Sequence, residues 1–144
     1  MTEIIDYPPN YPAIRKAFPQ VPLNRVLFAW GDDIYNPHNV KIPGPLKAHE
    51  AMHGRRQKLF ASGIEGWWKH YMTDHDFRLM EETVAHRVEY LVTASQSVMN
   101  RADRRGLLKS VSKRLAHPMY EFNLSNANAL RVLRDIPRKE DDVT

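Results

Sequence analysis

The sequence predicts an α+β fold that is mostly helical, with a small antiparallel sheet near the N-terminus. Three observations predict it: prolines recur between Met1 and Pro22, short β-favouring runs follow up to residue 42, and longer segments with helical spacing of apolar residues come after them. The 144 residues have the length of one domain. We expect this domain to span residues 1–137, and residues 138–144, RKEDDVT, to form a loose tail.

The sheet is predicted from three short runs with turn residues between them. The runs are RVLFAW at 25–30, DIY at 33–35 and VKI at 40–42. Glycine and aspartate after the first run, and the segment NPHN after the second, have the composition of turns. We therefore expect two or three antiparallel strands, preceded by one short helix near residues 13–18.

Four helices are predicted after the sheet. Their ranges are 45–60, 73–97, 107–116 and 125–136. Pro45 suits the first turn of the first helix, and Ser62-Gly63 suits the chain beyond its end. Thr73 is the expected N-cap of the long second helix. Between these two helices we expect a connection whose aromatic residues cover the core.

The composition argues against several classes of protein. There is no cysteine, so the chain can form neither a disulfide nor a thiolate metal site, which fits a reducing compartment. No apolar run approaches the roughly 18 to 20 residues of a membrane span, and the N-terminus lacks the pattern of a signal peptide. We therefore expect a cytoplasmic protein with no membrane partner.

The segment HEAMH, at residues 49–53, carries the clearest chemical signal. Residues four apart lie on one face of a helix, so His49 and His53 can direct their imidazoles at one point. Glu50 lies about 100° further around the helix, where a general base can hold a water beside the metal. This HExxH pattern is typical of zinc-assisted hydrolysis of an amide. We expect a Zn²⁺ cofactor, His49 and His53 as ligands and Glu50 as the catalytic base.

Around this motif the sequence resembles zinc metallopeptidases of the gluzincin kind, in which a glutamate on the next core helix is the third ligand. More narrowly, FAWGDDIYNP, HEAMHGRRQ and DFRLMEETVAHRVEY look like segments of small HExxH proteins encoded by bacteriophages. The resemblance extends from about Arg25 to Tyr90 and implies a zincin-like domain that hydrolyses a peptide or protein substrate. If the chain is phage-encoded, the resemblance implies that it is located in the host cytosol or in the virion. Its partners could then include other phage proteins.

Two neighbouring glutamates compete for the position of third ligand. Glu81 lies on the apolar stripe of its helix, which favours it as the inward-facing group. Glu82 is followed by Ala85 and His86, a small residue that lets two helices cross closely and a polar group that can support a ligand. The similar proteins also place their glutamate before such an E-x-x-A step. We predict Glu82 as the ligand, with Glu81 as the alternative.

Three further residues are candidates for contact with substrate. His86, one turn after Glu82, could orient a ligand or stabilise an oxyanion, or could simply pack in the interior. In similar peptidases a sheet edge beside the active helix pairs with an extended peptide, which places Trp30 and Gly31 near the substrate. The alternative is that RVLFAW is a core strand with no part in binding.

Two other functions compete with that of a zinc peptidase. A non-catalytic phage structural or assembly protein could keep the same fold, although it would have no use for Glu50 beside both histidines. The net charge of +4 and the basic segment at 101–114, RADRRGLLKSVSKR, allow a nucleic-acid-binding accessory domain. The segment has no aromatic residue that could stack on bases, so a solvated surface is favoured and a nucleic-acid partner is not expected. Salt-dependent retention on heparin would distinguish a nucleic-acid-binding segment from a solvated surface.

Overall fold

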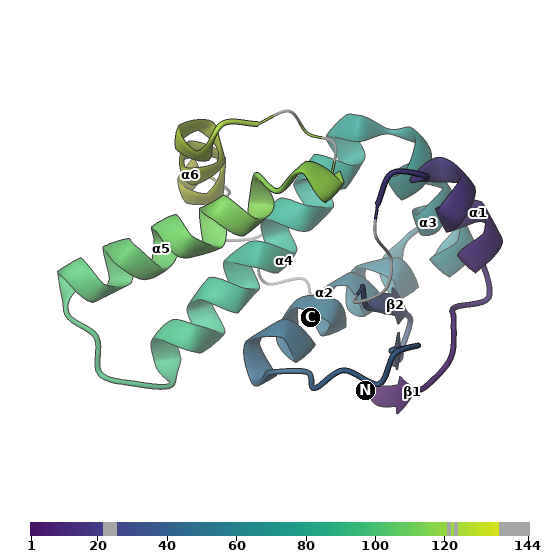
Figure 1. Ribbon diagram of the computed structural model, residues 1–144, viewed down its shortest axis with the longest axis horizontal. Coiled ribbons are helices and arrows are strands. Elements are labelled where there is room, and N and C mark those ends of the chain that lie inside the picture. Colours follow the sequence, from purple (N-terminus) through teal and green to yellow (C-terminus); the bar gives the residue numbers. More distant parts are fainter. Residues whose placement is uncertain (22–25, 121, 123, 136–144) are drawn as a thin grey trace.

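A computed structural model describes residues 1–21, 26–120, 122 and 124–135 (Figure 1). The elements in chain order are β1 (Thr2–Ile4), α1 (Tyr11–Ala17), β2 (Phe28–Trp30), β3 (Asp33–Tyr35), α2 (Gly44–Leu59), α3 (Gly63–Thr73), α4 (His75–Ser95), α5 (Arg101–Leu115), the 3₁₀ helix η2 (Pro118–Tyr120) and α6 (Asn126–Asp135). Helix predominates and the small sheet precedes α2, so the predicted α+β class is confirmed. The predicted tail, 138–144, lies outside the described residues.

The sheet is mixed rather than antiparallel. Its strand order is β1-β3-β2, and β2 pairs antiparallel with β3, as predicted. The third strand, β1, comes from the N-terminus and runs parallel to β3, with Thr2 opposite Asp33 and Ile4 opposite Tyr35. Parallel neighbours are joined by a long crossover, here the chain through α1, so local patterns along the sequence do not reveal their pairing.

The predicted strand VKI at 40–42 does not form. Both main-chain polar groups of Val40 are bound by the side chain of Asn36, whose Nδ2 donates to the Val40 carbonyl at 2.8 Å and whose Oδ1 accepts from the Val40 amide at 3.0 Å. Asn36 is buried. The side chain of a turn residue therefore takes the hydrogen bonds that a strand would have needed.

The helices differ from the prediction mainly where they begin. Residues 63–73 form α3 and not a connection, because Trp67, Trp68 and Tyr71 make one buried face of a helix. The N-cap of α4 is Asp74, whose carboxylate accepts from the Phe77 amide at 3.1 Å. Helix α5 begins six residues before the predicted position, because residues 100 and 103 form a capping box there. No helix in the described part of the chain is long and apolar enough to cross a membrane.

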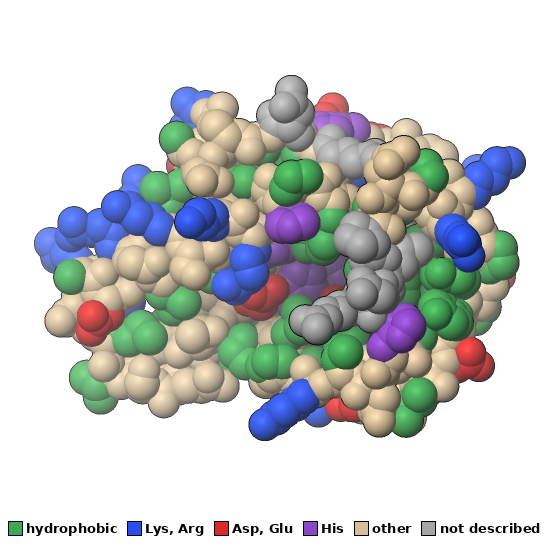
Figure 2. All heavy atoms as spheres, in the orientation of Figure 1, with side chains coloured by type: hydrophobic (Ala, Val, Ile, Leu, Met, Phe, Trp, Pro, Cys, Tyr) green, Lys and Arg blue, Asp and Glu red, His purple; other side chains and the backbone are tan. Residues whose placement is uncertain are grey.

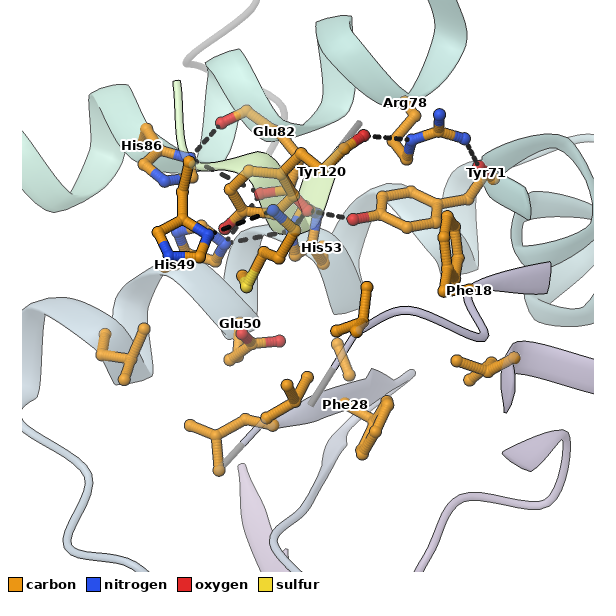
Figure 3. A pocket seen from close by; sticks show the side chains of 18 of the residues that line it. Phe18, Phe28, His49, Glu50, His53, Tyr71, Arg78, Glu82, His86 and Tyr120 are labelled. Carbon is orange, nitrogen blue, oxygen red and sulfur yellow. Dashed lines mark hydrogen bonds and ion pairs between the residues drawn. The ribbon is translucent and has the colours of Figure 1, made fainter. Parts of the chain in front are cut away.

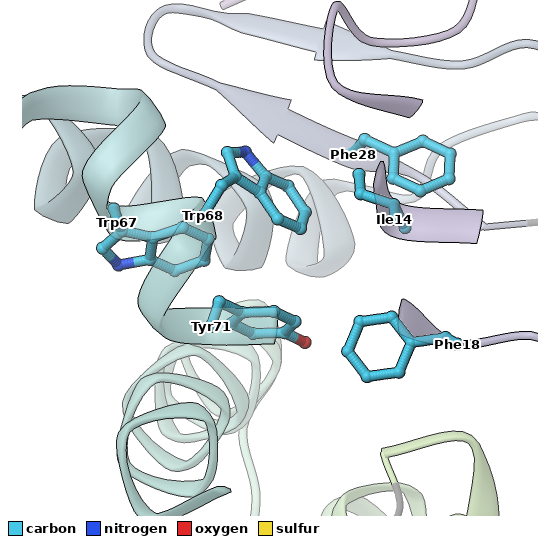
Figure 4. Close-up of a cluster of buried hydrophobic side chains, with 6 residues drawn as sticks. All are labelled: Ile14, Phe18, Phe28, Trp67, Trp68 and Tyr71. Carbon is cyan, nitrogen blue, oxygen red and sulfur yellow. The ribbon is translucent and has the colours of Figure 1, made fainter. Parts of the chain in front are cut away.

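Two apolar clusters lie on either side of the pair α2 and α4. The N-terminal cluster joins α1, β2 and α3 (Figure 4), and its buried members are Ile14, Phe18, Phe28, Trp67, Trp68 and Tyr71. The C-terminal cluster joins α5 and α6, and its buried members are Val111, Leu115, Phe122, Ala129 and Leu133. Between the clusters α2 and α4 lie side by side (Figure 1), with Met52 packed against Val84. The buried acidic, basic and histidine side chains among the described residues all belong to these two helices.

The β2–β3 hairpin lies directly against the backbone of α2. A Cβ added at Gly54 would stand only 2.0 Å from the carbonyl oxygen of Gly31, so this approach requires glycine. The fully buried side chain of Gln57 ties the two elements together. Its Oε1 accepts from the Gly31 amide at 2.8 Å, and its Nε2 donates to the Ala29 carbonyl at 3.0 Å. The hairpin thereby fixes α2 from one side.

Candidate metal centre

Helix α2 buries a polar face. Its buried residues are His49, Glu50, Met52, His53, Gly54 and Gln57. Among them only Met52 has an apolar side chain, whereas most surface helices bury an apolar stripe. Ionisable groups taken out of water are destabilising unless they are paired or bind a metal. The buried face of α2 is therefore unusual for a helix whose role is packing alone.

Three buried side chains converge at the junction of α2 and α4 (Figure 3). The Nε2 atoms of His49 and His53 are 3.1 Å apart, and they lie 3.4 and 3.3 Å from the two carboxylate oxygens of Glu82. Ligand atoms at the corners of a tetrahedron with bonds of about 2.0–2.1 Å are separated by about 3.3 Å. The group could therefore hold a metal ion, and its spacing fits a small tetrahedral one.

Glu82, and not Glu81, is brought to the histidines. Both glutamates are buried, so the apolar stripe of α4 does not distinguish them. The carboxylate of Glu81 accepts from Nε of Arg56 on α2, and this ion pair directs it away from His49 and His53. The structure thus favours the glutamate that is followed by Ala85 and His86 in the sequence.

Glu89 contacts Nδ1 of His49, the ring nitrogen that is not directed at Glu82. Its Oε1 lies 2.6 Å from Nδ1 of His49, and its other oxygen accepts from the guanidinium of Arg114. Burial raises the pKa of Glu89, but the contacts with His49, the charge of His86 and the bond from Arg114 outweigh it and lower the pKa to about 2. Carboxylates in this position orient a ligating imidazole and increase its basicity.

His49, His86 and Glu89 form a second combination that could hold a metal. The 2.6 Å between His49 Nδ1 and Glu89 is a hydrogen-bond distance and is shorter than the spacing of about 3.3 Å between two ligands of one tetrahedral ion. We therefore assign Glu89 to the support of His49. The sequence prediction missed Glu89, although its position seven residues, or two turns, after Glu82 places both on one face of α4.

His86 lines the cavity beside His49. Its ring stands edge-on to that of His49, with centroids 4.7 Å apart, and its Nδ1 lies 2.7 Å from the main-chain oxygen of Glu82. Burial, together with the positive charge of His49, lowers the pKa of His86 to about 4. His86 is therefore neutral near pH 7, with Nδ1–H donating to the carbonyl. Its predicted contact with substrate stays a prediction.

The charges of the centre attract a cation. Burial raises the pKa of Glu82, but the positive charge of His53 and the hydrogen bonds from both histidines lower it well below the usual range. Burial lowers the pKa of His49, yet hydrogen bonding to Glu82 and Glu89 raises it well above the usual range. A proton is thus held where a metal would bind, so the two compete and metal binding should weaken in acid.

Glu50 is buried but makes no hydrogen bond or ion pair with any described residue. Figure 3 shows its carboxylate below the histidines, in the space between them and Phe28 of β2. Burial raises the pKa of Glu50, and the charges of His49 and His53 act in the opposite direction. A carboxylate in this position is available to a bound molecule.

A cavity of about 480 Å³ gives access to the centre. Its lining includes the group of His49, His53 and Glu82 together with Glu50, and its apolar walls are formed by Phe18, Phe28 and other members of the N-terminal cluster. Figure 2 shows histidine and acidic side chains at the bottom of a hollow in the middle of this face. The cavity joins a charged floor to apolar walls, as in small-molecule and peptide sites.

Two phenols belong to the cavity. The hydroxyl of Tyr71 donates to Glu82, and Tyr120 lies beside His86 with ring centroids 5.5 Å apart. Arg78 holds both tyrosines, since its Nη1 donates to the Tyr71 carbonyl at 2.8 Å and its Nε to the Tyr120 carbonyl at 3.2 Å. Burial, and next the charge of Glu82, raise the pKa of each phenol well above its usual value, so both remain protonated. No sequence motif marks Tyr120, because a separate element, η2, brings it to the site.

Trp30 and Gly31 lie away from the cavity lining that the described residues form. The edge of β2 that faces the helices is already bound: the Ala29 carbonyl accepts from Gln57 and from Nε1 of Trp68, at 3.0 and 3.1 Å. The Gly31 amide likewise donates to Gln57. The Ala29 carbonyl is therefore not free for the predicted pairing of a peptide with this part of the strand.

Comparison of the chain with protein-family models, with curated proteins and with solved structures found no match. Its chemistry has to be inferred from the site itself.

Proposed function

We propose that the chain is a zinc-dependent peptidase, with His49, His53 and Glu82 as the metal ligands and Glu50 as the general base. The observation that supports this best is the convergence of three ligand atoms in one cavity beside a buried carboxylate, that of Glu50, which has no partner among the described residues. Two imidazoles and a carboxylate suit zinc. Catalytic zinc sites have three protein ligands and an open fourth position, whereas structural sites are closed by four.

Zinc in this position supplies a Lewis acid that activates a water and polarises a carbonyl. Glu50 takes the proton of the attacking water and transfers it to the leaving amine. Its raised pKa suits it to both steps, because it holds the proton more firmly than an exposed carboxylate. Glu89 keeps the imidazole of His49 oriented, and we assign the protonated phenol of Tyr120, which lines the cavity, the role of donating to the developing oxyanion.

The cavity walls indicate the kind of substrate. Phe18, Phe28 and Trp68 belong to an apolar surface that continues to the floor of the cavity. A peptide bound there would bury a large apolar side chain next to the scissile bond, and its burial would contribute roughly 1.5–3 kcal/mol. The substrate class we propose is therefore a peptide or an unfolded protein segment with such a side chain.

The test is the substitution Glu50→Gln, measured beside Glu65→Gln. Glu65 is an exposed glutamate of α3, so the second variant makes the same chemical change away from the cavity. Each protein is loaded with one equivalent of zinc and incubated with a peptide library, and the products are identified by mass spectrometry. Glu50→Gln should keep the fold and the zinc but reduce hydrolysis by about 10²–10⁴-fold, while Glu65→Gln should cleave like the wild type.

Two outcomes would count against the proposal. If Glu50→Gln retains zinc and cleaves as fast as the wild type, Glu50 is not the base. If zinc-loaded wild type cleaves nothing in the library, the centre has no catalytic role, and the non-catalytic phage structural or assembly function becomes the better explanation.

A further inference from the structure

Helix α5 carries a row of four exposed cations. Arg101, Arg105, Lys109 and Lys113 follow one another at intervals of four residues, and all four are exposed. Because residues four apart are neighbours on a helix surface, they form one continuous row, about 18 Å long at about 1.5 Å per residue. Figure 2 shows Lys and Arg side chains gathered over α5 on this face. We call these four residues the basic row.

The basic row is not neutralised within the part of the chain that the structure describes. None of its four members forms an ion pair with a described residue. The one acidic residue of α5, Asp103, accepts from the Asn100 amide in the capping box. The whole chain has 21 basic and 17 acidic residues, so the rest of the chain is balanced once the row is set aside. The net charge of the protein is thus equal to that of one helix face.

A row of small residues lies next to the cations. Ala102, Gly106 and Ser110 are also four apart and are exposed. Gly106 stands in the interior of a helix, where glycine is destabilising relative to alanine, yet a Cβ there would meet no atom of a described residue within 4 Å. Packing among the described residues gives no reason for glycine. A partner that approaches the helix backbone closely would give one.

The lack of aromatic residues in α5, which favours a solvated surface from the sequence alone, argues only against binding to unstacked bases. We propose that the basic row binds the phosphate backbone of double-stranded nucleic acid, independently of sequence. Evenly spaced cations on a rigid helix match a regular array of phosphates, and the small residues leave room for the backbone. Residues 101–115 contain no aromatic side chain, which disfavours stacking on single-stranded bases. A membrane surface fits less well, because the apolar residues of α5 pack into the C-terminal cluster and cannot insert into lipid.

The first measurement is the affinity of the full chain for a fluorescent DNA duplex as salt is varied. Four phosphate contacts give a slope of log K against log salt of about −3.6, which is a loss of roughly a hundredfold between 50 and 200 mM. The double variant Arg105→Gln/Lys109→Gln should reduce the magnitude of the slope by about 2. Its matched control is Arg15→Gln/Lys16→Gln, which removes the same charge from exposed positions on α1 and should reduce the slope much less.

A second variant tests the close approach. Gly106→Leu keeps every charge but adds a side chain beside the row, and it should weaken duplex binding about tenfold, as for the loss of about one contact. Its melting temperature should equal or exceed that of the wild type, so misfolding would not explain the loss.

Three results would overturn the proposal. They are a wild type that does not bind the duplex at 50 mM salt, equal losses from the two double variants, and binding to phosphatidylserine vesicles without binding to DNA. The last would identify the row as a membrane contact. None of these measurements depends on zinc or on hydrolysis, so the outcome is separate from that of the peptidase proposal.

Discussion

Helix α4 contributes to two buried regions of opposite character. Leu79 and Tyr90 pack against the C-terminal cluster, whose buried members are apolar. Glu82, His86 and Glu89 lie in the junction with α2, and they are just as buried as the members of that cluster. Apolar burial stabilises a fold by about 25 cal/mol per Å², whereas buried ionisable groups destabilise it unless they are compensated. Burial therefore has a different effect in the two regions. In the C-terminal cluster it stabilises the packing of the helices, whereas the buried charges of the junction are better explained by the metal ion that they could hold.

The largest effect is expected from a substitution in the apolar region. Leu133→Ala should lower the free energy of unfolding by about 2–5 kcal/mol, because the fully buried leucine leaves a cavity. Zinc affinity should not change, since the C-terminal cluster shares no ligand with the junction. Urea unfolding with a chelator present, and zinc titration of the folded variant, measure the two quantities separately. A parallel fall in zinc affinity would show that the C-terminal cluster and the junction are not independent.

The next effect compares two neighbouring residues of the junction. Glu82→Ala should weaken zinc binding at least about a hundredfold, because zinc sites with four ligands bind with roughly 10–16 kcal/mol and one ligand represents about 3 kcal/mol. Glu81→Ala should leave zinc binding nearly unchanged, since Glu81 pairs with Arg56. Competition with a chromogenic chelator measures both variants. The reverse order of effects would identify Glu81 as the ligand.

The smallest effect is a dependence of stability on pH in zinc-free protein. An unfolded histidine takes up a proton near pH 6.5, but folded His86 does so only near pH 4. The unfolded state then binds more protons between these values, so His86 should reduce stability by about 2 kcal/mol between pH 7.5 and 5. His49 acts with the opposite sign, because its pKa is raised.

The contribution of His86 is therefore isolated as the difference between wild type and His86→Gln in urea unfolding at each pH. The variant should be the less sensitive to acid over this range. His75→Gln, which changes an exposed histidine of the same helix, should follow the wild type. If all three proteins give the same curve, His86 is not held neutral by burial.

Local sequence patterns predicted those residues of the candidate site whose positions follow from the geometry of a single helix. The spacing of His49 and His53 follows from the helix itself, and Glu82 was selected by the residues one turn after it. Glu89 and Tyr120 were missed for a different reason. Glu89 becomes part of the site only because Arg114 and His49 approach it from two other helices, and Tyr120 is placed by η2.

The same distinction explains the errors in the fold. The parallel pairing of β1 joins residues about thirty positions apart, and no pattern within either strand encodes it. For residues 63–73 the sequence predicts a connection whose aromatic residues cover the core. Tertiary packing makes them one face of a helix. The strand expected at 40–42 does not form because the side chain of Asn36 makes two hydrogen bonds with the backbone of Val40.

The close approach at Gly54 implies that the candidate metal site depends on the absence of a side chain at the residue next to it. The residue before Gly54, His53, is one of the converging histidines, and metal–ligand distances are held to within about 0.2 Å. Any side chain at position 54 would act as a wedge between α2 and the hairpin, and it would turn or shift the helix within one residue of that imidazole. Tolerance to substitution should therefore be lowest at a position that touches neither metal nor substrate, and a redesign of this scaffold would have to leave that position empty.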